Sequence, residues 1–211
     1  AMHPNNKPIV NLLFNEPLSQ YTSWRIGGPA KQYFRPRDSV DLQQFLQHLP
    51  ETEPLFWLGL GSNVLIRDGG FDGTVIHTLK MLSQIEIVDQ GQNLQTGLLM
   101  RVDAGVPCAK IAKLAAKHAV VGAEFFAGIP GTLGGALAMN AGAFGGETWQ
   151  HVVAVEVINR HGEIKTRSRQ EYQIGYRSVL GPPDEWFLSA QLKFMPGDQY
   201  QAQQRIKELL Q

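Results

Sequence analysis

Small residues dominate one stretch of the chain in a way that favours close approach of the backbone to a bound ligand. Seven glycines fall between Gly128 and Gly146, although strand-like and helix-like patterns flank this stretch. A glycine backbone can pass within contact distance of something flat or bulky. Close packing of two backbones is the alternative, but Thr132 and Asn140 add polar groups that dry packing would not favour. The segment therefore predicts a ligand-lined cleft.

A second glycine cluster, Gly59-Leu60-Gly61-Ser62-Asn63, follows an apolar run directly. Consecutive backbone amides in such a turn form an anion-binding nest that suits a pyrophosphate. The dinucleotide fingerprint fails, because Val64 stands where its last glycine belongs, and a P-loop fails because no Gly-Lys-Ser/Thr is present. Phosphate binding and tight-turn packing both remain open for this segment.

Tyr176-Arg177 follows Gly175 in a stretch that reads as a loop. An arginine keeps its charge and forms bidentate hydrogen bonds to carboxylates, so Arg177 suits an anionic substrate. An isolated arginine is more often a solvated surface residue. Context has to decide between these two interpretations.

Other chemistries find little support in the sequence. The six histidines show no His-x-His or H-E-x-x-H spacing, so no metal site is expected. No G-x-S-x-G elbow of a serine hydrolase is present. The single cysteine, Cys108, stands at the start of a predicted helix without an evident histidine partner, and it is predicted to be a small buried residue.

Composition limits the partners and the compartment. The 211 residues include 19 Lys+Arg and 19 Asp+Glu, so no basic surface for nucleic acid or an anionic membrane is expected. No apolar run approaches the roughly 18 residues of a spanning helix. These two observations predict a soluble protein that acts on a small molecule. The lone cysteine and a polar N-terminus without a signal-peptide pattern predict a cytoplasmic location.

The elements that must position these motifs divide near Leu79. Before it, an N-cap at 36–39 predicts a helix that ends at Pro50, and apolar runs predict three short strands at 55–60, 64–66 and 74–78. After it, hairpins are predicted at 84–88 with 98–102 and at 152–158 with 163–167. A helix should have Pro107 as its first residue and stop at Gly122, 186–194 should form a last strand, and 199–211 has high helix propensity.

Five motifs occur in an order that resembles the UDP-N-acetylmuramate dehydrogenase family. They are Tyr21-Thr22-Ser23-Trp24-Arg25-Ile26-Gly27-Gly28-Pro29-Ala30, Gly59 to Asn63, Gly128 to Gly135, Asn140 to Ala143 and Tyr176-Arg177. The resemblance covers about residues 15–196. It implies an α+β FAD-binding module of the vanillyl-alcohol oxidase / p-cresol methylhydroxylase type. Subdomains at 15–79 and 80–196 would hold the flavin between them, and 197–211 would connect to a further, substrate-binding domain.

The resemblance also implies roles for individual residues. Arg177 would stabilise negative charge on the substrate carboxylate, and Tyr176 would support it. FAD would be held noncovalently, because the loop that carries a flavin-linking histidine in some relatives has none here. The pyrophosphate would be bound by Gly59, Gly61, Ser62 and Asn63, and the flavin cleft would be lined by Gly131, Thr132, Gly134, Gly135, Asn140 and Gly142.

The implied reaction uses NADPH to reduce UDP-N-acetylglucosamine enolpyruvate to UDP-N-acetylmuramate for peptidoglycan synthesis. Two departures matter: Ser178 follows Arg177 directly where the family reads Tyr-Arg-x-Ser, and the chain stops before the family's proton donor and the arginine's glutamate partner. We therefore expect this chain alone to bind FAD without turnover. The alternatives are another noncovalent flavin oxidoreductase of this fold and a non-catalytic flavin-binding module.

Overall fold

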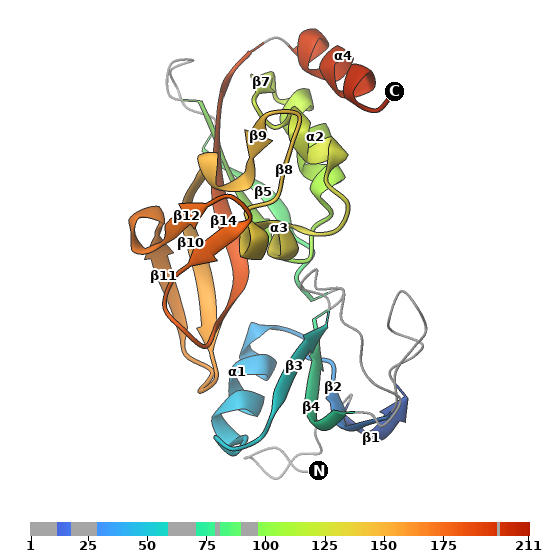
Figure 1. Cartoon of the computed structure of the whole chain (residues 1–211), viewed down its shortest axis with the longest axis vertical. Helices are drawn as coiled ribbons and strands as arrows, with labels where there is room; N and C mark the ends of the chain where they lie inside the picture. Colours follow the sequence, from blue (N-terminus) through green and yellow to red (C-terminus); the bar gives the residue numbers. More distant parts are fainter. Residues whose placement is uncertain (1–11, 18–28, 59–70, 79–80, 90–96, 198) are drawn as a thin grey trace. The chain divides into compact units, whose positions relative to one another are not determined.

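A computed structural model describes residues 12–17, 29–58, 71–78, 81–89, 97–197 and 199–211 of the chain (Figure 1). The residues form two compact units. The first comprises Ala1–Met81 with Asn159–Glu163, and the second comprises Leu82–Ile158 with Ile164–Gln211. The division falls two residues after the boundary expected from sequence, and the second unit includes the segment 197–211 that was expected to be a separate connector. Both units combine helices with sheets, as an α+β fold requires.

The first unit is built on a four-stranded sheet with the order β1-β2-β4-β3. Its strands are β1 (Leu12–Pro17), β2 (Pro29–Phe34), β3 (Leu55–Leu58) and β4 (Phe71–His77). The central strand β4 runs parallel to both β2 and β3, whereas β1 is antiparallel to β2. The predicted strands at 55–60 and 74–78 are confirmed over the residues described, and the one predicted at 64–66 lies outside them.

Helix α1 (Ser39–His48) begins at the N-cap segment that the sequence predicts, and it ends at His48, two residues before the predicted end at Pro50. Asp38 is the N-cap, and its Oδ1 accepts a hydrogen bond from the backbone N–H of Asp41 at 2.8 Å. Phe45 turns inward and stacks on Phe34 of β2, with 4.1 Å between the ring centroids. The helix therefore buries its apolar stripe within the first unit.

His77, the last residue of β4, is a buried titratable group in this unit. Its Nδ1 is hydrogen-bonded to the hydroxyl of Tyr33, which is also buried. Burial, with a smaller contribution from the charge of Arg35, lowers the pKa of His77 to about 4. The folded protein therefore holds this imidazole neutral at pH values at which an unfolded chain protonates it.

This shift predicts a pH-dependent stability. Because the folded pKa lies below the unfolded value of 6.5, stability is fully present above pH 6.5 and is lost as the pH falls from 6.5 towards 4. The loss should reach on the order of 3 kcal/mol. Urea unfolding as a function of pH measures it. His77→Asn, which keeps an acceptor for Tyr33, should flatten the dependence, and His48→Asn at the exposed end of α1 should not. An unchanged slope in the His77 variant would exclude this source.

The second unit is built on a larger sheet with the strand order β11-β10-β14-β6-β5, and β7 also pairs with β14. The strands are β5 (Ile85–Asp89), β6 (Leu98–Asp103), β7 (Val120–Val121), β10 (Val152–Asn159), β11 (Ile164–Ser168) and β14 (Glu185–Pro196). Pairing of β5 with β6 and of β10 with β11 is antiparallel, so both predicted hairpins are confirmed. The predicted final strand is β14, which extends to Pro196.

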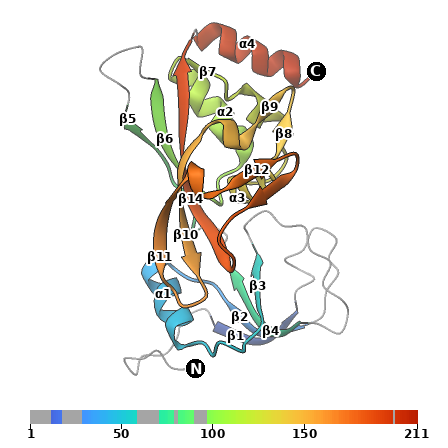
Figure 2. The same cartoon turned by 60° about the vertical axis from the view of Figure 1, so that its left-hand side comes forward.

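The core of this unit lies between the sheet and short helices: α2 (Cys108–Lys117), the 3₁₀ helix η2 (Glu124–Gly128) and α3 (Leu133–Met139). Helix α4 (Gln199–Leu209) lies beside α2 in both views (Figure 2) and contributes Ile206 to the core. The helix predicted in 199–211 is thus confirmed. Within the described residues, no helix is long and apolar enough to cross a membrane.

The prediction for α2 is wrong at both ends. Pro107 is the N-cap residue rather than the first helical residue, and the helix ends at Lys117 rather than at Gly122. The early end has a backbone cause: Ala119 adopts a φ of +54°, and the chain then enters β7. Cys108 is confirmed as a buried residue, and burial raises the pKa of its thiol to about 12.

Candidate functional site

A cavity of about 300 Å³ brings together four of the predicted site residues in the second unit: Asn140, Gly142, Tyr176 and Arg177. Two tight hairpins border it. One is formed by β8 (Gly142–Ala143) and β9 (Gly146–Glu147), and the other by β12 (Gln173–Gly175) and β13 (Ser178–Leu180). The rest of the lining is Ala143, Phe144, Gly145, Gly146 and Glu147.

The hairpin β12–β13 presents the Tyr-Arg pair. Gly175 pairs with Ser178, so Tyr176 and Arg177 form a two-residue turn, where a loop was expected. Arg177 adopts a φ of +47°, and Tyr176 is 83% exposed. The Arg177 guanidinium lies 5.6 Å from the centre of the Tyr176 ring. In the described part of the chain, no carboxylate forms an ion pair with Arg177, so its charge is available to an anion.

The hairpin β8–β9 explains several glycines by packing alone. Ala143 pairs with Gly146, and the turn residues Phe144 and Gly145 have φ values of +54° and +85°. A Cβ on Gly128 would lie 2.3 Å from the Phe144 ring, and a Cβ on Gly142 would lie 2.6 Å from the carbonyl oxygen of Gly146. Close packing, which the sequence left open as the alternative, thus accounts for Gly128 and Gly142 without a ligand.

Asn140 connects the two hairpins. It caps α3 with a left-handed backbone, at a φ of +46°, and only 3% of it is exposed. Its Nδ2 donates to Glu147 Oε2 at 3.2 Å and to the Gly175 carbonyl at 3.0 Å, and its Oδ1 accepts from the backbone N–H of Trp149 at 3.1 Å. Both amide protons are therefore used inside the protein.

The start of α3 differs from Asn140 at its end in the polar groups that it leaves without a partner among the described residues. The backbone N–H groups of Leu133 and Gly134 donate to the carbonyls of Val106 and Ala104 at 2.9 and 2.8 Å, which fixes the helix to the loop after β6. Gly131 is exposed, with a φ of +93°, and no described atom lies within 4 Å of where its Cβ would be. The hydroxyl of Thr132 is buried and has no hydrogen-bond partner among the described residues. An open glycine beside an unpaired hydroxyl fits a polar cofactor group.

Several predicted residues stay untested by this geometry. Gly59, Gly61, Ser62 and Asn63 lie outside the described residues. Gly135 is the third residue of α3. Ser178, to which the sequence assigned no role, begins β13 opposite Gly175. Over the part of the chain that is described, no group of three His, Cys, Asp or Glu side chains could hold a metal ion.

Sequence reasoning assigned no site role to five of the lining residues, and Phe144 and Glu147 are the two with large side chains. Phe144 is 52% exposed at its hairpin tip, and a large aromatic residue among glycines was a signal that could have found it. Glu147 carries no such signal. Its importance follows from the hydrogen bond that it accepts from Asn140, which only the folded chain reveals.

Comparison with known proteins gives consistent results. Residues 30–168 match the family described as FAD binding domain. A UDP-N-acetylenolpyruvoylglucosamine reductase of Legionella pneumophila (strain Corby) is 53% identical over 94% of this chain and 62% of its own length. The Coxiella burnetii (strain Dugway 5J108-111) protein of that name is 48% identical over 94% of this chain and 67% of its own. The chain thus spans about three fifths of the length of the first of these relatives.

Solved structures agree on the fold. The UDP-N-acetylenolpyruvylglucosamine reductase of Thermus caldophilus superposes with a TM-score of 0.71 at 28% identity, covering 94% of this chain and 66% of that one. Cholesterol oxidase from Brevibacterium sterolicum, at 16% identity and a TM-score of 0.61 over 93% of this chain and 40% of its own, shows the fold alone. The chain therefore belongs to the FAD binding domain family and, within it, to the UDP-N-acetylenolpyruvoylglucosamine reductases.

Proposed function

We propose that this chain is the FAD-binding part of a cytoplasmic reductase that uses NADPH to convert UDP-N-acetylglucosamine enolpyruvate to UDP-N-acetylmuramate. The names and identity of the relatives support the reaction. In this chain, the placement of Arg177 is the observation that supports the proposal. Its guanidinium is exposed at the tip of a hairpin beside a 300 Å³ cavity, and it has no ion-pair partner among the described residues.

FAD is held noncovalently in this proposal. Thr132 contributes its hydroxyl, which has no hydrogen-bond partner among the described residues, and Gly131 contributes the surface next to it, which no described atom covers. Asn140 and Gly142 form part of the cleft lining. The side-chain amide of Asn140 does not donate to FAD, because both of its protons are bonded within the protein. The remaining contacts are assigned to Gly134 and Gly135 for the flavin cleft and to Gly59, Gly61, Ser62 and Asn63 for the pyrophosphate.

When bound, FAD supplies hydride transfer from the nicotinamide to the enolpyruvyl double bond. The residues of this chain supply charge and orientation. The Arg177 guanidinium binds the enolpyruvyl carboxylate, on which negative charge grows during the transfer. Tyr176 lies beside the guanidinium and supports its position through a cation–π contact.

A chimaera tests this function: the chain is joined to the part of the Legionella relative that it does not cover. We expect NADPH-dependent formation of UDP-N-acetylmuramate. The loss of NADPH absorbance and analysis of the product measure it. A folded, FAD-loaded chimaera that leaves this substrate unreduced would contradict the proposal. Turnover of another small unsaturated acid in that case would identify a different flavin oxidoreductase of the same fold.

A further inference from the structure

We propose that Asn140 is a positioning residue, which holds the Tyr176-Arg177 turn beside the cavity by binding the carbonyl of Gly175. The proposal rests on the function above, because that function makes Arg177 the group that binds the substrate carboxylate. In this proposal, the role of Asn140 is indirect. It acts by holding Arg177 in place and not by contacting the cofactor or the substrate.

The hydrogen bonds of the Asn140 side-chain amide support this positioning role. Gly175 is the last residue of β12 and immediately precedes the turn, and its carbonyl oxygen lies 3.0 Å from Asn140 Nδ2. The other two bonds of the amide go to Glu147 Oε2 and to the backbone N–H of Trp149. One side chain therefore connects the end of α3, the β9 segment and the hairpin that carries Arg177.

Asparagine suits this position for two reasons. The amide offers two donors and an acceptor, and here all of these are used. The backbone at residue 140 is left-handed, with a φ of +46°, a conformation that asparagine tolerates better than most residues. An aspartate would keep the backbone but would turn a carboxylate towards Glu147 and towards the Gly175 carbonyl, with no proton to donate.

The remaining anchors of the hairpin lie further from its tip. Ile174 and Val179 are partly buried and pack against the core of the second unit. At the tip itself, Arg177 lacks an ion pair within the described residues, and Tyr176 is 83% exposed. Among the described residues, the bond from Asn140 is thus the contact that fixes the turn on its cavity side, and its loss should free the tip while the core stays packed.

Trypsin cleavage after Arg177 measures the freedom of this tip in the chain itself. Asn140→Gly removes the amide and suits the left-handed backbone. We expect the initial rate of cleavage after Arg177 to rise about fivefold or more, the effect of losing a hydrogen bond. Cleavage after Lys117, at the end of α2, should change much less. Asn140→Asp should raise the Arg177 rate at least as much as glycine does.

Thr148→Val is the matched control. Thr148 is buried, and its hydroxyl donates to the Ala141 carbonyl at 2.8 Å, so the variant loses one hydrogen bond in the same neighbourhood without touching Gly175. Its cleavage after Arg177, relative to Lys117, should stay at the wild-type level. Unchanged relative cleavage in both Asn140 variants, or an equal rise in Thr148→Val, would overturn the proposal.

A second readout separates positioning from general damage. In the chimaera, Asn140→Gly should lower kcat/KM for the enolpyruvyl substrate several-fold. The same substitution in an Arg177→Ala background should cost little further, because the residue that Asn140 positions is then absent. An equal loss with and without Arg177 would contradict a positioning role. The cleavage experiment needs no cofactor, so its outcome stands whether or not the chain proves to bind FAD.

Discussion

Replacing Arg177 by alanine is expected to lower kcat/KM for the enolpyruvyl substrate about 10²- to 10³-fold in the chimaera. The variant removes a preorganised positive charge from the place where negative charge grows, and such groups are worth this much in comparable sites. Arg177 is exposed and lies at a turn with no ion pair in the described part of the chain, so its loss should leave stability and FAD affinity unchanged. Steady-state kinetics, thermal melting and FAD titration measure the three quantities.

Arg177→Lys is the graded control for this prediction. Lysine keeps the charge but lacks the planar fork that binds a carboxylate with two parallel hydrogen bonds, so its activity should lie between wild type and alanine. Glycine is favoured at a φ of +47°, so Arg177→Gly tests whether backbone strain contributes. Alanine within threefold of wild type would remove Arg177 from the proposed mechanism.

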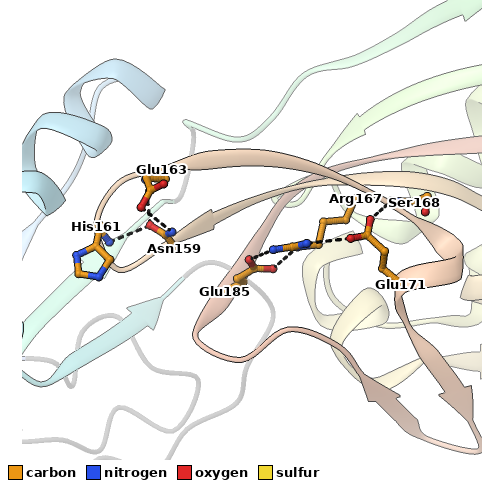
Figure 3. A network of polar contacts seen from close by, with 7 residues as sticks. All are labelled: Asn159, His161, Glu163, Arg167, Ser168, Glu171 and Glu185. Atoms are coloured by element: carbon orange, nitrogen blue, oxygen red, sulfur yellow. Dashed lines mark hydrogen bonds and ion pairs between the residues drawn. The ribbon is translucent and has the colours of Figure 1, made fainter.

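Arg167→Met is expected to destabilise the protein by about 3 kcal/mol. Figure 3 shows the Arg167 guanidinium between two carboxylates: it binds Glu185 with two hydrogen bonds, at 2.8 and 2.6 Å, and Glu171 with one at 2.9 Å. The Glu185 side chain is only 8% exposed, so the variant leaves a buried charge without its partner. Differential scanning calorimetry should show a fall in Tm of roughly 6–12 °C.

A surface pair provides the comparison. Arg205 and Glu208 lie 3.5 Å apart on α4, with side chains 55% and 63% exposed, so Arg205→Met should cost less than about 1 kcal/mol. The double variant Arg167→Met/Glu185→Leu should recover part of the loss, because it removes the unpaired carboxylate as well. If Arg167→Met and Arg205→Met melt at the same temperature, the buried pair is not a major source of stability.

Local sequence rules predicted much of the fold because the energetic cause of each element is itself local. The N-cap segment 36–39 ahead of an apolar periodicity predicted the start of α1, and the side chain of Asp38 in this segment caps the helix. Apolar runs on either side of polar turns predicted both hairpins of the larger sheet. The end of α2 was missed because no glycine or proline marks it: Ala119 takes a left-handed conformation that its sequence gives no reason to expect.

The candidate site was only partly predictable, because long-range contacts create it. The Tyr-Arg pair was recognised as a motif, but its two-residue turn depends on the pairing of Gly175 with Ser178. Glycines that read as a ligand-binding surface divide into those that packing against backbone requires, such as Gly142, and those that no described atom approaches, such as Gly131. The bond from Asn140 to Gly175 joins residues 35 positions apart, which no local pattern encodes.

Titration of the purified chain with FAD tests the central claim most directly. We predict saturable quenching of flavin fluorescence and, at 100 times the Kd, a stabilisation of about 2.7 kcal/mol, which corresponds to a rise in Tm of roughly 5–11 °C. Thr132→Val, which replaces the buried Thr132 hydroxyl by a methyl group of similar size, should weaken the binding. A folded chain that neither quenches flavin fluorescence nor gains stability at millimolar FAD would contradict the account.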